Sequence, residues 1–119
     1  MAQTQKVYLG NAFSLSMLPM SEEVTIRFKK VGVEEVKALL SNGGVISAIG
    51  HPSTASALSK ILGVNVPTNR VSITLQPGDT LIVFQLAVGR LAPGQELTEQ
   101  DILNAFSQGK AYFVIARVQ

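Results

Sequence analysis

The sequence predicts a single α/β sandwich, in which a central, mostly five-stranded sheet is flanked by about three helices. Apolar residues recur at every second position in some segments and at every third or fourth position in others, and the two spacings alternate along the chain. The 119 residues are 46% hydrophobic, which is enough to fill one core. Because no linker, internal repeat or low-complexity tract interrupts this pattern, we expect one domain over residues 1–119.

Two short strands and a helix open the predicted domain. Residues 6–10 form the first strand candidate, and Val24, Ile26 and Phe28 alternate with polar residues as in a half-buried strand. Residues 33–40 have helical spacing, and the Asn-Gly-Gly that follows them tolerates the left-handed backbone angles that end a helix.

The short apolar run at residues 45–49 does not indicate one particular element, and a second helix is predicted to begin just after it. Pro52 suits the first turn of a helix, and Ser53 and Thr54 can cap it, so His51 lies at the helix N-terminus. The buried stripe of this helix and the glycine that ends it are Ala55, Leu58, Leu62 and Gly63.

The second half of the chain repeats the alternation. Val71, Ile73 and Leu75 form a predicted strand, and residues 76–79 form a turn. Residues 81–88 are nearly all apolar, which predicts a central strand.

The last predicted elements are a helix and a strand. Residues 98–101 resemble a capping box at the start of the helix. The inward residues of this helix and its final glycine are Ile102, Leu103, Phe106 and Gly109. Residues 111–118 then close the chain as a strand.

Charge and composition limit the function classes. Only 15% of the residues are charged and the formal net charge is +2, so a small phosphate-bearing ligand suits this chain better than DNA or long RNA, which needs many phosphate contacts. With no cysteine and one histidine, we expect neither a disulfide nor a bound metal, and no cofactor is indicated. No apolar run approaches the roughly 20 residues that span a bilayer, and no signal-peptide pattern occurs, so we expect a cytoplasmic protein without membrane contact.

The candidate site residues lie near the ends of predicted strands. His51 is the side chain suited to proton transfer near neutral pH, and a helix N-terminus can bind an anion. Further polar residues that could bind phosphate or ribose are Asn11, Ser14 and Ser16 after the first strand, Arg90 after the central strand, and Arg70. Each has a structural alternative: a satisfied helix cap, an ordinary turn, or exposed surface charge. Neither GxxxxGK[ST] nor GxGxxG occurs, which argues against ordinary nucleotide hydrolases and dehydrogenases.

Four ordered motifs resemble the viral ring nuclease family, the type III anti-CRISPR proteins of archaeal viruses and phages, which also have bacterial and archaeal relatives. The motifs are Asn11-Ala12-Phe13-Ser14, Ser47-Ala48-Ile49-Gly50-His51-Pro52-Ser53-Thr54, Asn69-Arg70-Val71, and Arg90-Leu91 with Gly94 and Leu97-Thr98. The likeness runs from about Lys6 to Val118. It implies a homodimer that binds cyclic tetra-adenylate, the second messenger of type III CRISPR systems, and cuts it without metal into linear di-adenylate.

The resemblance also implies roles for individual residues. His51 matches the general acid that protonates the leaving 5′-oxygen, Arg90 offsets charge on the phosphate, and Ser14 positions the reacting groups. The residues implied in ligand binding are Asn11, Ser16, Arg70, Gly50, Ser53 and Thr54. The product carries a 2′,3′-cyclic phosphate, and a virus-encoded enzyme of this kind would act in the host cytoplasm and shut off type III CRISPR signalling.

The chain departs from the family pattern at one place. Many viral relatives carry Arg-Leu-Glu-Glu-Gly where this chain has Arg90-Leu91-Ala92-Pro93-Gly94, so a carboxylate is missing that could orient the histidine or the ribose. Glu96 is the nearby substitute. A protein that sequesters the cyclic nucleotide without cutting it is therefore an alternative, and an interaction domain that pairs through an edge strand is a third.

Overall fold

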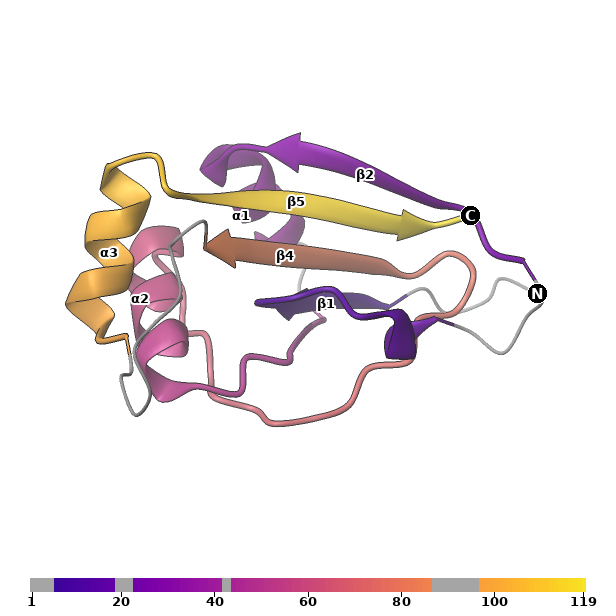
Figure 1. The fold of residues 1–119 in the computed structure, drawn as a ribbon, viewed down its shortest axis with the longest axis horizontal. Coiled ribbons are helices and arrows are strands. Elements are labelled where there is room, and N and C mark those ends of the chain that lie inside the picture. Colours follow the sequence, from indigo (N-terminus) through magenta and orange to yellow (C-terminus); the bar gives the residue numbers. More distant parts are fainter. Residues whose placement is uncertain (1–5, 19–22, 42–43, 87–96) are drawn as a thin grey trace.

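A five-stranded sheet runs through the molecule, with three helices packed against it (Figure 1). The computed structural model describes residues 6–18, 23–41, 44–86 and 97–119. In chain order the elements are β1 (Val7–Gly10), the 3₁₀ helix η1 (Leu15–Met17), β2 (Ile26–Val31), α1 (Val33–Ser41), β3 (Val45–Ser47), α2 (Pro52–Leu62), β4 (Thr80–Leu86), α3 (Glu99–Ser107) and β5 (Ala111–Val118). The predicted α/β class is confirmed. Within the described ranges, no helix has the length and apolar character needed to cross a bilayer.

The strand order places the ends of three strands together. The order is β2-β5-β4-β1-β3, so β4 is the central strand, as predicted, although residues 87–88 of that prediction lie outside the described part of the chain. β1 pairs in parallel with β3 and with β4, whereas β5 is antiparallel to β4 and β2. The carboxyl ends of β1, β3 and β4 therefore share one end of the sheet, toward α2 and α3 in Figure 1.

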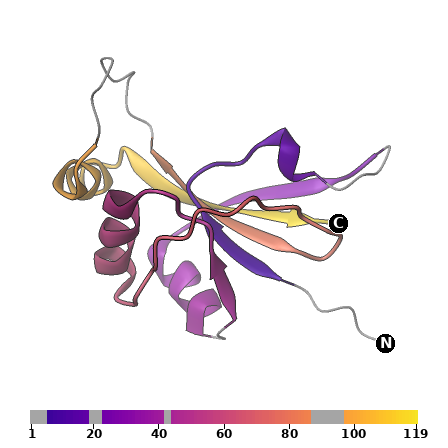
Figure 2. The ribbon, with the colours of Figure 1, turned by 90° about the horizontal axis from the view of Figure 1, so that it is seen from below.

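The two faces of the sheet are covered differently. On one face, Leu9, Ile82 and Phe113 pack with helix residues such as Val36 and Leu58 in the larger core cluster. The alternate strand positions point to the other face, which carries no helix among the described residues other than the short η1. Figure 2 shows the helices and η1 on opposite sides of the sheet.

The end of α2 and the start of α3 follow the predicted local signals. α2 begins at Pro52 and is closed by Gly63, whose φ of 71° lets its N–H donate to the Ser59 carbonyl at 2.9 Å. At α3, Thr98 accepts a hydrogen bond from the Asp101 N–H and Asp101 accepts one from the Thr98 N–H, which confirms the capping box. The ambiguous run at residues 45–49 contributes the short strand β3.

The predicted strand at residues 71–75 is wrong. Ile73 and Leu75 are buried as the alternation indicated, but they pack on the face opposite the helices and this segment joins no strand ladder. The Leu75 N–H instead donates to the Met17 carbonyl in η1 at 2.7 Å. An extended segment that crosses over a sheet face shows the same alternation as a strand, which is why the pattern misled.

The second strand is also less buried than its alternation predicted. β2 is an edge strand, and Phe28 is 55% exposed, although Ile26 on the same face is half-buried. The reason is that the face opposite the helices is only partly covered here, by Phe13, whose ring meets Phe28 edge-on at 5.3 Å.

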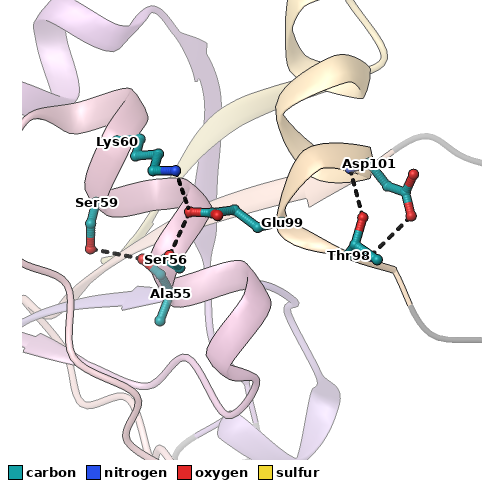
Figure 3. Close-up of polar contacts among 7 residues, drawn as sticks. All are labelled: Ala55, Ser56, Ser59, Lys60, Thr98, Glu99 and Asp101. Atoms are coloured by element: carbon teal, nitrogen blue, oxygen red, sulfur yellow. Dashed lines mark hydrogen bonds and ion pairs between the residues drawn. The ribbon is translucent and has the colours of Figure 1, made fainter.

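A polar contact fixes the second helix against the third (Figure 3). The Glu99 carboxylate at the start of α3 accepts a hydrogen bond from the Ser56 hydroxyl and lies 3.1 Å from the Lys60 ammonium, both on α2. The hydrogen bond from Ser56, followed by that from Lys60, holds the pKa of Glu99 below its ordinary value. The ionised carboxylate therefore contributes to the packing of α2 on α3.

Substitution of Glu99 should make stability less sensitive to acid. Because the pKa of Glu99 is lowered in the folded protein, the unfolded chain binds a proton at this carboxylate more readily than the folded chain does. The stabilisation is present above the pKa of an unfolded glutamate, about 4.3, and is lost as the pH falls from there through the folded pKa. We expect Glu99→Gln to show a shallower fall of the urea midpoint between about pH 5 and about pH 3. Glu23→Gln, at an exposed position outside the helices, is the control and should keep the wild-type slope. Equal slopes in all three proteins would contradict the assigned role.

Candidate functional site

Segments that follow neighbouring strands meet at one end of the sheet. Asn11 comes directly after β1, and residues 48–51 connect β3 to α2. The Ala48 N–H donates to the Leu9 carbonyl at 2.8 Å, so the two chain segments stay side by side beyond the strands themselves. This parallel pairing brings Asn11 and the histidine segment to the same end of the sheet. By contrast, η1, with Ser14 and Ser16, lies toward the amino ends of β1 and β4, where the Leu75 N–H donates to the Met17 carbonyl, so the structure does not bring these serines beside His51 (Figure 1).

His51 occupies the N-cap position of α2. Its backbone is extended, with φ of −119° and ψ of 126°, and its carbonyl accepts the first helical hydrogen bond, from the Ala55 N–H at 3.0 Å. The imidazole makes no capping hydrogen bond and is exposed. The side chain is therefore free of the helix backbone, beside N–H groups that can attract an anion.

The prediction that Ser53 and Thr54 cap α2 is wrong. Both lie within the first helical turn, because His51 itself is the N-cap. Thr54 is 6% exposed, since it points into the core as Leu58 does one turn later, whereas Ser53 is half-buried. Of the two, Ser53 is the more accessible to a ligand at this helix end.

Arg70 packs directly against Gly50. A β-carbon built at Gly50 would lie 3.0 Å from Cγ and 3.4 Å from Nε of Arg70, so the absence of a side chain at Gly50 allows Arg70 to approach this closely. Arg70 thus lies beside the residue that precedes His51. The structure brings together a cation, an imidazole and a helix N-terminus that the sequence placed in two separate motifs.

Hydrogen bonds hold the Arg70 segment in place. The Asn69 N–H donates to the Ile49 carbonyl and the Asn69 side-chain amide donates to the Ser47 carbonyl, each at 2.7 Å. The Ser47 hydroxyl donates to the Pro67 carbonyl at 2.7 Å. Neither Ser47 nor Asn69 received a structural role in the sequence analysis. The sequence features that could have indicated these roles are a small polar residue, Ser47, within a short apolar run, and a second polar residue, Asn69, directly before Arg70.

The first loop presents two linked hydroxyls. Ser14 is the N-cap of η1, and its Oγ accepts a hydrogen bond from the Ser16 N–H at 3.3 Å and lies 2.9 Å from the Ser16 Oγ. Both serines are exposed and Asn11 is half-buried. Hydroxyls can donate or accept, which suits them to contact with ribose and phosphate oxygens.

Two predicted site residues cannot be placed. Arg90 and Glu96 belong to the segment between β4 and α3, at residues 87–96, which lies outside the described part of the chain. Their predicted roles remain predictions.

Comparison with known proteins finds similar chains in archaeal viruses. The protein is 32% identical to an uncharacterized protein of Acidianus filamentous virus 1, over 93% of this chain and 94% of that one, and 41% identical to one of Sulfolobus islandicus filamentous virus, over 75% and 74%. The solved structure of B116 of Sulfolobus turreted icosahedral virus superposes with a TM-score of 0.73 and 32% identity, covering 94% of this chain and 98% of that one. Residues 7–111 match the model of the STIV B116-like family, and the chain belongs to this family of archaeal virus proteins.

Proposed function

We propose that this protein is a metal-independent ring nuclease that cleaves cyclic tetra-adenylate to linear di-adenylate and so shuts off type III CRISPR signalling. The observation that carries the proposal is the exposed His51 imidazole at the N-terminus of α2, with Arg70 packed against the adjacent Gly50. An imidazole exchanges protons near neutral pH, and a guanidinium binds two phosphate oxygens. A proton donor and an anion site thus lie side by side.

The proposed reaction uses the substrate's own nucleophile. The ribose 2′-oxygen forms a bond to phosphorus as the bond from phosphorus to the 5′-oxygen breaks, which leaves a 2′,3′-cyclic phosphate. The 5′-oxygen takes a proton from His51, and the proton of the 2′-hydroxyl passes to solvent. A general acid in this position typically contributes about 10²–10⁴-fold in rate.

Other residues would bind and align the ring. Arg70, which packs against Gly50, and the N–H groups at the start of α2 would receive a phosphate beside His51. Asn11 would hold the ribose so that its 2′-oxygen lies in line with the breaking bond, a positioning effect that can exceed the effect of the acid. Ser14 and Ser16, on η1 and away from His51, would contact another part of the ring. Arg90 would offset the charge that gathers on the phosphate oxygens.

A homodimer would suit a ring of four equal nucleotides. Each subunit would present one His51 to one of two opposed phosphodiesters, because a two-fold axis relates both the subunits and the halves of the ring. Two cuts would then yield two identical di-adenylates.

A binding protein that holds the ring without cutting it is the second candidate. The observation that favours it is the Ala92-Pro93 pair, which stands where the related motif carries carboxylates. Such a protein would still need the anion site beside His51 but would lose little when the imidazole is removed.

Removal of the imidazole separates the two candidates. With labelled cyclic tetra-adenylate and excess chelator, we expect His51→Ala to cut about 10²–10⁴-fold more slowly than the wild type while still binding the ring. Lys37→Ala, at an exposed position on α1, is the control and should cut at the wild-type rate. A ring that stays intact with both the wild type and the His51→Ala variant, yet co-elutes with each, would identify a sequestering protein. Neither cutting nor binding by the wild type would exclude both functions.

A methyl group at residue 50 should weaken ligand binding without weakening the fold. In Gly50→Ala the new β-carbon makes Arg70 shift by a few tenths of an ångström. We expect this shift to weaken the affinity for cyclic tetra-adenylate, by no more than the roughly tenfold that complete loss of one charged contact is worth. Gly32→Ala is the matched control, because a β-carbon there meets no atom within 4 Å. Titration of the ring and the thermal midpoint of each variant provide the measurement. An unchanged affinity in Gly50→Ala would remove Arg70 from the site.

A further inference from the structure

A groove with a surplus of positive charge lies on the helix-covered face of the sheet, at the ends of β2 and β5 that extend beyond α1 (Figure 1). One part has a volume of about 310 Å³, and the adjoining part, which reaches α1, has a volume of about 270 Å³. Glu35, Ile115 and Arg117 line both parts, so the two parts form one groove. Its lining also includes Arg27, Lys29 and Leu39.

Two arginines lie opposite each other in this groove. Arg27 of β2 and Arg117 of β5 are directly paired in the antiparallel register, and both are exposed. Both lie on the helix face, because Ile115, two residues before Arg117, belongs to the core cluster under the helices, and cross-strand partners share a face. Like charges directly opposite each other destabilise a sheet, so an anion between the two guanidiniums would relieve this repulsion.

The described part of the chain supplies no such anion. None of its carboxylates forms an ion pair with Arg27 or Arg117. Glu35, the acidic residue in the groove, instead lies 3.7 Å from the Lys29 ammonium. Three cations and one carboxylate leave a formal charge of +2 in the groove, which equals the formal charge of the whole chain. The groove is therefore complementary to an anionic partner.

Protection of the sheet edge does not account for all of these charges. Charged side chains on an edge strand such as β2 can serve only to block pairing with another chain. Arg117, however, lies on β5, which has β2 on one side and β4 on the other, so it protects no edge. Beside it, Ile115 is buried and Leu39 is half-buried, which gives the groove an apolar side as well as a charged one.

The groove suits a polypeptide better than a nucleic acid. Among the described strands β2 pairs only with β5, so its outer edge offers backbone N–H and C=O groups to an added strand. An added strand would place alternate side chains on the helix face beside Arg27 and Lys29, where a glutamate carboxylate can meet a guanidinium. A nucleic acid duplex needs many phosphate contacts, and the groove offers three cations.

We propose that the outer edge of β2 is a docking site for an acidic, extended segment of another protein, which joins the sheet as a strand and places its carboxylates on Arg27 and Arg117. The docking site lies at the opposite end of the sheet from the candidate functional site, because Arg117 pairs with Thr80 at the start of β4, whereas residues 48–51 follow the carboxyl end of β3. The inference therefore goes beyond the proposed function and does not depend on it.

Fluorescence anisotropy with a labelled peptide of alternating glutamate and valine tests the docking site. We expect the double variant Arg27→Gln, Arg117→Gln to bind this peptide about tenfold more weakly than the wild type, near the upper end for the loss of two exposed ion pairs. Because the substitutions remove a repulsion, the thermal midpoint of this variant should not fall below the wild-type value. The double variant Lys37→Gln, Lys110→Gln loses the same charge at exposed positions outside the groove and is the control.

The same peptide with every backbone nitrogen methylated keeps its carboxylates but cannot donate to a strand, and it should not bind. Tight binding of the acidic peptide by the wild type and the control, with the expected loss in the groove variant, would support the docking site. No binding of the acidic peptide, equal affinities in the two double variants, or undiminished binding of the methylated peptide would each overturn it. A short DNA duplex that binds more tightly than the peptide and loses affinity in the groove variant would also overturn it, because the groove would then be a phosphate-binding surface.

Discussion

β1 pairs in parallel with β3 on one side and with β4 on the other, and the placement of the candidate site depends on this pairing. Parallel strands end at the same end of a sheet, so Asn11 and the His51 segment come together although about forty residues of chain separate them. The hydrogen bond from Ala48 to Leu9 extends the pairing past the strands. With a different strand order, Asn11 and the His51 segment would lie in separate turns and would not be close to each other.

The site itself depends on polar contacts between irregular segments. Hydrogen bonds from the Ser47 hydroxyl and the Asn69 amide hold residues 67–70 against the segment that leads into α2. Arg70 can then pack against Gly50, which has no side chain to exclude it. Elsewhere on α2, Ser56 and Lys60 tie the helix to α3 through Glu99. The helix that begins after His51 is therefore held both at its entry and along its length, as the role proposed for His51 requires.

The two faces of the sheet are covered unequally. The helices cover one face of the sheet, where Phe84 and Phe113 pack with Leu58 of α2 and all three side chains are 0% exposed. On the other face, Phe28 is 55% exposed. The buried rings contribute to stability, and the exposed ring contributes only when something covers it.

Local signals in the chain were sufficient to predict the α/β class, the three helices, the end of α2 at Gly63 and the start of α3 at Thr98, because caps, terminal glycines and helical spacing act within a few residues of one another. They misplaced the cap of α2 at Ser53 and Thr54, where His51 is the N-cap. They also indicated His51 at a helix N-terminus. Long-range packing, by contrast, decides that residues 45–47 pair as a strand, that residues 71–75 cross a sheet face without pairing, and that Arg70 lies against Gly50. Apolar alternation indicates only which side chains are buried. A short stretch of sequence does not determine which other segment buries them, or which distant loops come together.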